Sequence, residues 1–228
     1  MKPFLALAAL ILAGTFSTDA ASIQEADKLA ESGSYQKALE IYEALKPANA
    51  EEARAIAYKT ANARWRSQAG SENSDDTQTR RAEEALKQIV AGEKHDRIWA
   101  DANESLGDFY WIRRNQQNWG GAWPYYSAAL DYWAGESDVE PAAKHYLQIL
   151  WRAAEPNQPQ AYYGYYGNYL PIEVLENAVQ IAKTPEDQAE AHYLLAMSLR
   201  YQGGSARAWR RVPVEFDAAL KLGKKTSW

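Results

Sequence analysis

Beyond its N-terminal segment, the chain carries apolar residues at helical spacing, in stripes separated by short polar or glycine-containing turns. In residues 23–46, Ala26 and Leu29 form one stripe, Gly33 marks a turn, and a second stripe begins at Tyr35. Small and large apolar residues alternate within these stripes, which lets two antiparallel helices approach closely. The pattern therefore predicts a pair of packed helices in this segment.

Comparable stripes follow along the rest of the chain, and no strand-like alternation of useful length interrupts them. We expect further helices over 51–69 and 80–91, around Leu106 and after the turn 118–121, and others that begin at Pro141, at Pro171, at Pro185 and after Gly203-Gly204. Thr79, which follows a polar loop, is expected to cap the helix 80–91. Pro124 is expected in the first turn of its helix, and Pro213 early in the last one. Together these signals predict an all-α chain of roughly ten helices.

The third pair contains the most specific motif. Leu106-Gly107-Asp108-Phe109-Tyr110 matches the Leu-Gly-x-x-Tyr core of a tetratricopeptide helix, in which Gly107 allows a close helix approach. The chain resembles tetratricopeptide repeats over residues 22–222, strongly in the first and third pairs. The resemblance implies a right-handed α-solenoid of about five antiparallel helix pairs.

In such repeats, partners bind in a concave groove lined mainly by the first helix of each pair. Some of the residues at the corresponding positions must belong to the core, so none is assigned as a binding residue. The positions are Tyr58, Asn62, Trp65, Asn103, Tyr110, Tyr146 and Tyr193.

A second resemblance concerns the family context. The stretch from Trp119-Gly120-Gly121 onwards, and especially residues 207–228, resembles the N-terminal helical region of bacterial alpha-2-macroglobulin family proteins. These proteins sit at the cell envelope, and the family entraps proteases. The family's reactive Cys-Gly-Glu-Gln thioester cannot be present because the chain has no cysteine. The resemblance therefore implies a context and no chemistry. No polar capping helix follows Leu222, so we expect the array to continue in the full-length protein.

The first twenty residues have the features of a secretory signal. Lys2 supplies the positive start, an apolar run follows over 4–14, and small side chains stand at Thr18 and Ala20. The run is too short to span a bilayer, so we expect a cleaved signal peptide over 1–20, with an uncleaved anchor as the alternative. The sequence thus predicts export to the periplasm or cell envelope, and a helical repeat domain over 21–228 with no further membrane span.

The amino-acid composition argues against several classes of partner and site. The net charge of −5 argues against a nucleic-acid partner, because phosphate binding needs clustered basic residues. The absence of cysteine excludes disulfides, zinc–thiolate sites and thiol nucleophiles. The chain is rich in aromatic residues, with 9 Trp and 15 Tyr, which suits both packed helix arrays and binding grooves.

The sequence contains no motif that is typical of a catalytic site. His95, His145 and His192 each stand alone, without the helical spacing to a second ligand that a metal site favours. The carboxylates are distributed as solvated faces, and no Gly-x-Ser-x-Gly elbow or phosphate loop occurs. We therefore expect no catalytic, cofactor-binding or metal-binding residues and no enzymatic activity.

One segment, 161–170, is a candidate ligand-contact strip. Its tyrosines and glycines suit a recognition surface for peptide or sugar, but tyrosines that cover the edge of the helix array would show the same pattern. The candidate residues are Tyr162, Tyr163, Tyr165, Tyr166 and Tyr169.

Taken together, the sequence predicts a non-enzymatic protein–protein interaction scaffold of the cell envelope, the N-terminal repeat arm of a macroglobulin-like protein. Its partner would be a protein or peptide. The alternative is an envelope glycan- or peptide-binding module that uses the tyrosine segment.

Overall fold

A computed structural model describes residues 22–69, 76–113, 118–154, 170–202 and 204–224, and every regular element in these ranges is an α-helix. The all-α prediction is therefore confirmed. The helices are α1 (Ile23–Glu31), α2 (Tyr35–Ala44), α3 (Ala50–Gln68), α4 (Asp76–Val90), α5 (Arg97–Trp111), α6 (Trp119–Ala134), α7 (Val139–Ala154), α8 (Ile172–Ile181), α9 (Pro185–Gln202) and α10 (Ala206–Gly223).

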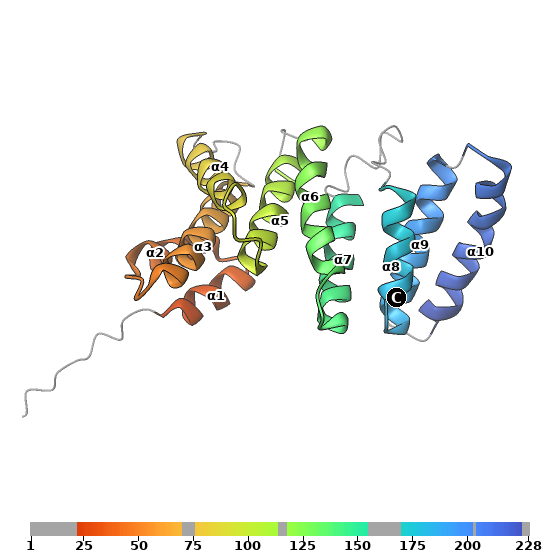
Figure 1. Cartoon of the computed structure of the whole chain (residues 1–228), viewed down its shortest axis with the longest axis horizontal. Helices are drawn as coiled ribbons and strands as arrows, with labels where there is room; N and C mark the ends of the chain where they lie inside the picture. The colour runs from red at the N-terminus through yellow and green to blue at the C-terminus, as the bar shows by residue number, and fades with distance from the viewer. Residues whose placement is uncertain (1–21, 70–75, 114–117, 155–169, 203, 225–228) are drawn as a thin grey trace, which may run out of the picture.

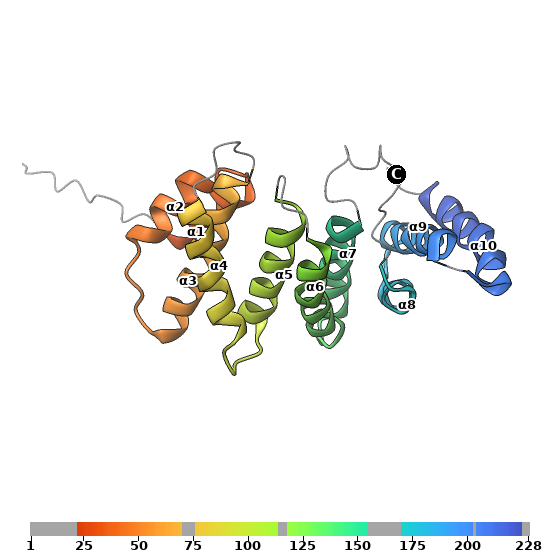
Figure 2. The same cartoon turned by 90° about the horizontal axis from the view of Figure 1, so that it is seen from above.

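The helices follow one another in a row from α1 and α2 at one end to α10 at the other (Figures 1 and 2). Each helix packs mainly against its neighbours in sequence. In addition, α3 contacts α5, α5 contacts α7, and α7 contacts α9. These four helices, which we call the odd-helix layer, therefore lie against one another along one side of the row.

Local signals account for several helix ends. The side chains of Asn49 and Asp96 accept hydrogen bonds from the backbone three residues on, at 2.9 and 3.1 Å, and cap α3 and α5. Gly33, with a φ of 80°, follows the end of α1, and the next amide, that of Ser34, donates to the carbonyl of Leu29 at 2.8 Å. Gly33 thus turns the chain into α2, as the sequence predicted.

Two predicted helix starts are wrong. Helix α4 begins at Asp76, so Thr79 lies inside it, buried, and its hydroxyl donates to the Asp76 carbonyl at 3.2 Å instead of capping the helix. Helix α6 begins at Trp119, within the predicted turn, because Asn118 caps it by accepting from Gly121 N at 3.0 Å. Pro124 consequently lies in the second turn of α6 rather than the first.

The core consists of apolar clusters that follow one another along the row. The first joins α1, α2 and α3, the second joins α3, α4 and α5, and the third extends from the end of α5 to α10. Tyr110 and Ile112 pack against both of the larger clusters and connect them. Apolar side chains are therefore buried between successive helices, which agrees with the stripes of small and large residues in the sequence.

No helix in the part of the chain described here is long and apolar enough to cross a membrane. The predicted signal peptide lies outside the described residues, so its expected cleavage stays a prediction.

The predicted close approach at Gly107 is confirmed. A Cβ atom on Gly107 would stand 2.5 Å from the ring of Tyr126, which is fully buried between α5 and α6. Carbon atoms that are not bonded to each other do not lie this close, so the ring or the helices would have to move apart. The absence of a side chain at Gly107 thus sets the distance between these two helices.

We expect Gly107→Ala to lower the free energy of unfolding by about 1–3 kcal/mol, because the added methyl group displaces the Tyr126 ring. Urea denaturation followed by circular dichroism measures this loss. Gly120→Ala is the matched control, because Gly120 is exposed in α6 and its Cβ would meet only an Asn118 oxygen at 3.8 Å. Equal stabilities of the two variants would contradict the assigned role of Gly107.

Candidate functional site

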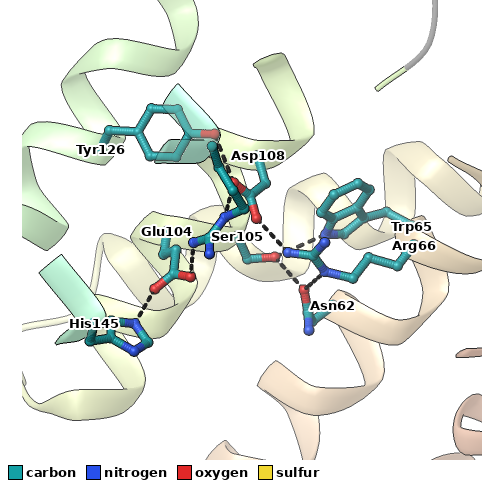
Figure 3. A network of polar contacts seen from close by, with 9 residues as sticks. Asn62, Trp65, Arg66, Glu104, Ser105, Asp108, Tyr126 and His145 are labelled. Atoms are coloured by element: carbon teal, nitrogen blue, oxygen red, sulfur yellow. Dashed lines mark hydrogen bonds and ion pairs between the residues drawn. The ribbon is translucent and has the colours of Figure 1, made fainter. Parts of the chain in front are cut away.

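A polar network centres on the carboxylate of Asp108 on α5, whose side chain is completely buried. It accepts hydrogen bonds from Arg66 on α3 at 2.5 Å, from the Tyr126 hydroxyl on α6 at 2.7 Å and from Arg152 Nε on α7 at 3.1 Å (Figure 3). Burial favours the neutral acid, but the charges of Arg152 and Arg66 hold the pKa of Asp108 below its usual range. A single carboxylate therefore ties three other helices to α5.

The network continues on both sides of Asp108 (Figure 3). Arg152 also donates to Glu104, and the other oxygen of Glu104 lies 2.5 Å from His145 Nε2. We call the whole set the Asp108 network. Its members are Asn62, Trp65, Arg66, Glu104, Ser105, Asp108, Tyr126, His145 and Arg152.

On the α3 side, the indole of Trp65 donates to the Ser105 hydroxyl at 2.9 Å, and Ser105 in turn donates to Asn62 Oδ1 at 2.8 Å. The same Asn62 oxygen accepts from Arg66 Nε at 2.9 Å. These bonds satisfy polar groups that would otherwise be costly to bury between α3 and α5. The network thus fixes how three helices of the odd-helix layer lie against one another.

Asp101 lies beside this network on α5, one turn before Glu104. Burial, and then the nearby charge of Glu104, raise the pKa of Asp101 to about 6. The positive charges of Arg97 and Lys59 oppose this rise, and the Arg97 guanidinium is 3.8 Å away. The carboxylate is therefore poorly compensated when it is charged.

Asp101, Glu104 and His145 also form a possible metal-ligand group. Among the residues that the structure describes, this is the group of three His, Cys, Asp or Glu side chains whose ligand atoms lie within 4.8 Å of one another. Both oxygens of Glu104 already accept bonds from Arg152 and His145, so a cation would have to compete with these partners. We therefore assign Glu104 and His145 to the Asp108 network, with Asp101 beside it.

Sequence reasoning missed this grouping because it searched for ligands within one helix. His145 is 41 residues away from Glu104 in sequence and reaches it from α7. The available signal was the three-residue spacing of Asp101 and Glu104, which places both carboxylates on one face of α5. Of the other two histidines, His95 stacks on Trp99 at 4.3 Å between ring centroids, and His192 lies 2.7 Å from Glu215.

A groove of about 930 Å³ opens between α7 and α9 in the odd-helix layer, and we call it the α7–α9 groove. Gln148 and Trp151 line it from α7, while Asp187 and Glu190 line it from α9. The indole of Trp151 donates to Glu190 at 2.7 Å, and its ring stacks on Tyr193 with centroids 5.9 Å apart. Trp151 is partly exposed, so it presents a fixed aromatic surface to the groove.

The residues predicted to line a first-helix groove divide into two sets. Trp65, Asn103 and Tyr146 are buried and belong to the core, so they are not available to a ligand. The other four keep partial exposure: Tyr58, Asn62, Tyr110 and Tyr193. All five residues of the candidate tyrosine strip, Tyr162, Tyr163, Tyr165, Tyr166 and Tyr169, lie outside the described residues.

Comparison with known proteins identifies no relative: no family model, no curated protein and no solved structure matches the chain. The contacts and grooves of the chain itself therefore carry the functional argument.

We expect Asp108→Ala to lower the free energy of unfolding by about 3–5 kcal/mol, because it leaves two partly buried guanidinium groups without their shared, fully buried acceptor. Denaturant titration measures the loss. Glu43→Ala is the control: Glu43 pairs with Arg64 at 2.6 Å but its side chain is 48% exposed, so its removal should cost less than about 1 kcal/mol. A loss at Asp108 no larger than that at Glu43 would show that the network adds little to stability.

We expect Asp101→Asn to stabilise the protein at about pH 8 and to have no effect near pH 4. The pKa of Asp101 is raised in the folded state, so the folded state binds the proton more tightly, and stability falls as pH rises from about 4 to about 6. The shift from 3.8 to about 6 corresponds to at most about 3 kcal/mol above that range.

Thermal unfolding across this pH range tests the expectation, with Glu173→Gln on the exposed face of α8 as the control. A gain for Asp101→Asn that is the same at pH 4 and pH 8 would exclude titration of this carboxylate as its cause.

Proposed function

We propose that this protein is a non-enzymatic interaction scaffold whose odd-helix layer binds a segment of a partner protein. In this proposal the helices form a right-handed, tetratricopeptide-like solenoid of about five antiparallel pairs. The direct contacts along α3, α5, α7 and α9 support such an arrangement, because first helices line the binding side of these repeats. The α7–α9 groove is the single observation that carries the binding function.

The groove has properties that suit a protein segment. Its volume of about 930 Å³ is at the upper end of the range for ligand sites, roughly 300–1,000 Å³. Trp151 stands in it with its indole held by Glu190 and its ring stacked on Tyr193. A tryptophan that is already fixed loses little rotamer freedom on binding, and tryptophan is enriched among residues that dominate binding energy.

The location of the scaffold is proposed from the sequence alone. The basic start, apolar run and small residues of 1–20 support export to the periplasm or cell envelope. The resemblance of residues 207–228 to the helical region of macroglobulin-family proteins supports a place in a protease-inhibitor assembly, and this remains a prediction. Binding of an envelope glycan by the tyrosine segment likewise stays the alternative prediction.

Site-specific photo-crosslinking tests the proposed binding side. A photoreactive phenylalanine analogue replaces Gln148, which is exposed in the α7–α9 groove, or Gln88, which is exposed on α4 outside the odd-helix layer. We expect a discrete adduct with a cell-envelope protein from position 148 and none from position 88. The adduct should disappear when Trp151→Leu is added, because this change removes the aromatic surface of the groove.

Adducts of equal yield from both positions would show non-specific contact. A discrete adduct from position 88 alone would place the binding surface on the other side of the row. Either result would remove the proposed function of the groove.

A further inference from the structure

The α7–α9 groove has an unequal distribution of charge. Four carboxylates line it: Asp138, Glu186, Asp187 and Glu190. Two cations, Lys144 and Arg152, line it as well. In the part of the groove that the structure describes, the lining therefore carries formal charges of four negative and two positive, which makes this part acidic.

The charge of Arg152 is largely committed elsewhere. Its guanidinium bonds Glu104 and the fully buried Asp108, so two carboxylates that belong to the Asp108 network share it. A cation bound in this way contributes little positive potential to the groove, because the paired charges cancel at a distance. Among the described lining residues, Lys144 is then the remaining cation, against four carboxylates.

The position of the acidic residues on α9 strengthens this asymmetry. The first turn of a helix normally attracts anions, because its free amides carry partial positive charge. In α9 that turn contains Glu186 and Asp187, and the hydroxyl of Thr184 accepts from the Asp187 amide at 3.1 Å. These groups offset the positive helix end, so the groove does not have the usual anion site there.

An aromatic surface lies among these carboxylates. Trp151 is fixed by its bond to Glu190, so a π-face and a carboxylate stand next to each other in the groove. Lysine and arginine side chains bind such pairs well, because the ring attracts a cation by its quadrupole while the carboxylate forms an ion pair. An acidic or phosphorylated ligand would instead be repelled by the surplus of negative charge.

We propose that the α7–α9 groove is selective for a cationic partner segment, in which a lysine or arginine side chain lies on Trp151 and its charge pairs with the carboxylates of α9. The inference rests on the proposed function, since it names the chemistry of the segment that the scaffold binds. The selectivity comes from the groove's own charges and not from the net charge of the chain.

Fluorescence anisotropy with two labelled synthetic peptides of equal length tests the selectivity. One peptide alternates arginine and glycine, and the other alternates glutamate and glycine. We expect the arginine peptide to bind the protein and the glutamate peptide to show no saturable binding. Raising the salt concentration should weaken the arginine complex, because added ions screen partly exposed charges.

Two pairs of substitutions locate the binding. Glu186→Gln with Asp187→Asn neutralises two groove carboxylates and should weaken arginine-peptide binding about tenfold, as expected when favourable charge pairs are lost. Glu84→Gln with Asp217→Asn removes the same charge from exposed positions on α4 and α10 and should change affinity less than twofold, within the roughly 0.4 kcal/mol expected of surface charges. Circular dichroism verifies that all variants remain folded. Trp151→Leu should weaken binding while leaving the salt dependence in place.

The outcomes distinguish a failure of the cationic selectivity from a failure of the proposed scaffold function. Equal weakening by the two charge pairs, or binding of the glutamate peptide, would overturn the cationic selectivity. If neither peptide binds but the crosslink from position 148 forms, the selectivity is wrong and the scaffold function stands. If neither peptide binds and no crosslink forms, both proposals fail.

Discussion

The arrangement of α3, α5, α6 and α7 depends on one buried carboxylate. Asp108 is fully enclosed, and a charge in that position is tolerated only because Arg66, Tyr126 and Arg152 all donate to it. These donors come from three other helices, so the requirement to compensate one charge sets the relative positions of four helices. Gly107 serves the same purpose from the adjacent position, because its missing side chain brings the Tyr126 ring close enough for the hydroxyl to reach Asp108.

The sequence predicted those features that depend on neighbouring residues. Helical stripes, the turn at Gly33 and the close approach at Gly107 all have local signatures, and the structure confirms them. The start of α4 was placed too late, because Thr79 resembles a cap in sequence but is buried by tertiary packing, which extends the helix to Asp76. The start of α6 was also placed too late, since Gly120-Gly121 resembles a turn but follows the capping residue Asn118.

The candidate site was much less predictable than the fold. The bonds of the Asp108 network to Arg66 and Arg152 join residues 42 and 44 positions apart, and one sequence contains no information on which distant residues pair. The prediction of groove residues was wrong at three positions for a related reason. Periodicity places Trp65, Asn103 and Tyr146 on first helices, but it does not distinguish the face that meets the neighbouring helix from the face that meets a ligand.

Arg152 connects the stability of the fold to the chemistry of the groove. The residue lines the α7–α9 groove, yet its guanidinium is bonded to Asp108 and Glu104 on α5. If Arg152 were free to face the groove, it would oppose the carboxylates of α9 as a second cation beside Lys144. The buried network thus stabilises the helix layer and, by the same bonds, keeps the groove acidic. On the proposed function, a change in the network should therefore alter ligand preference as well as stability.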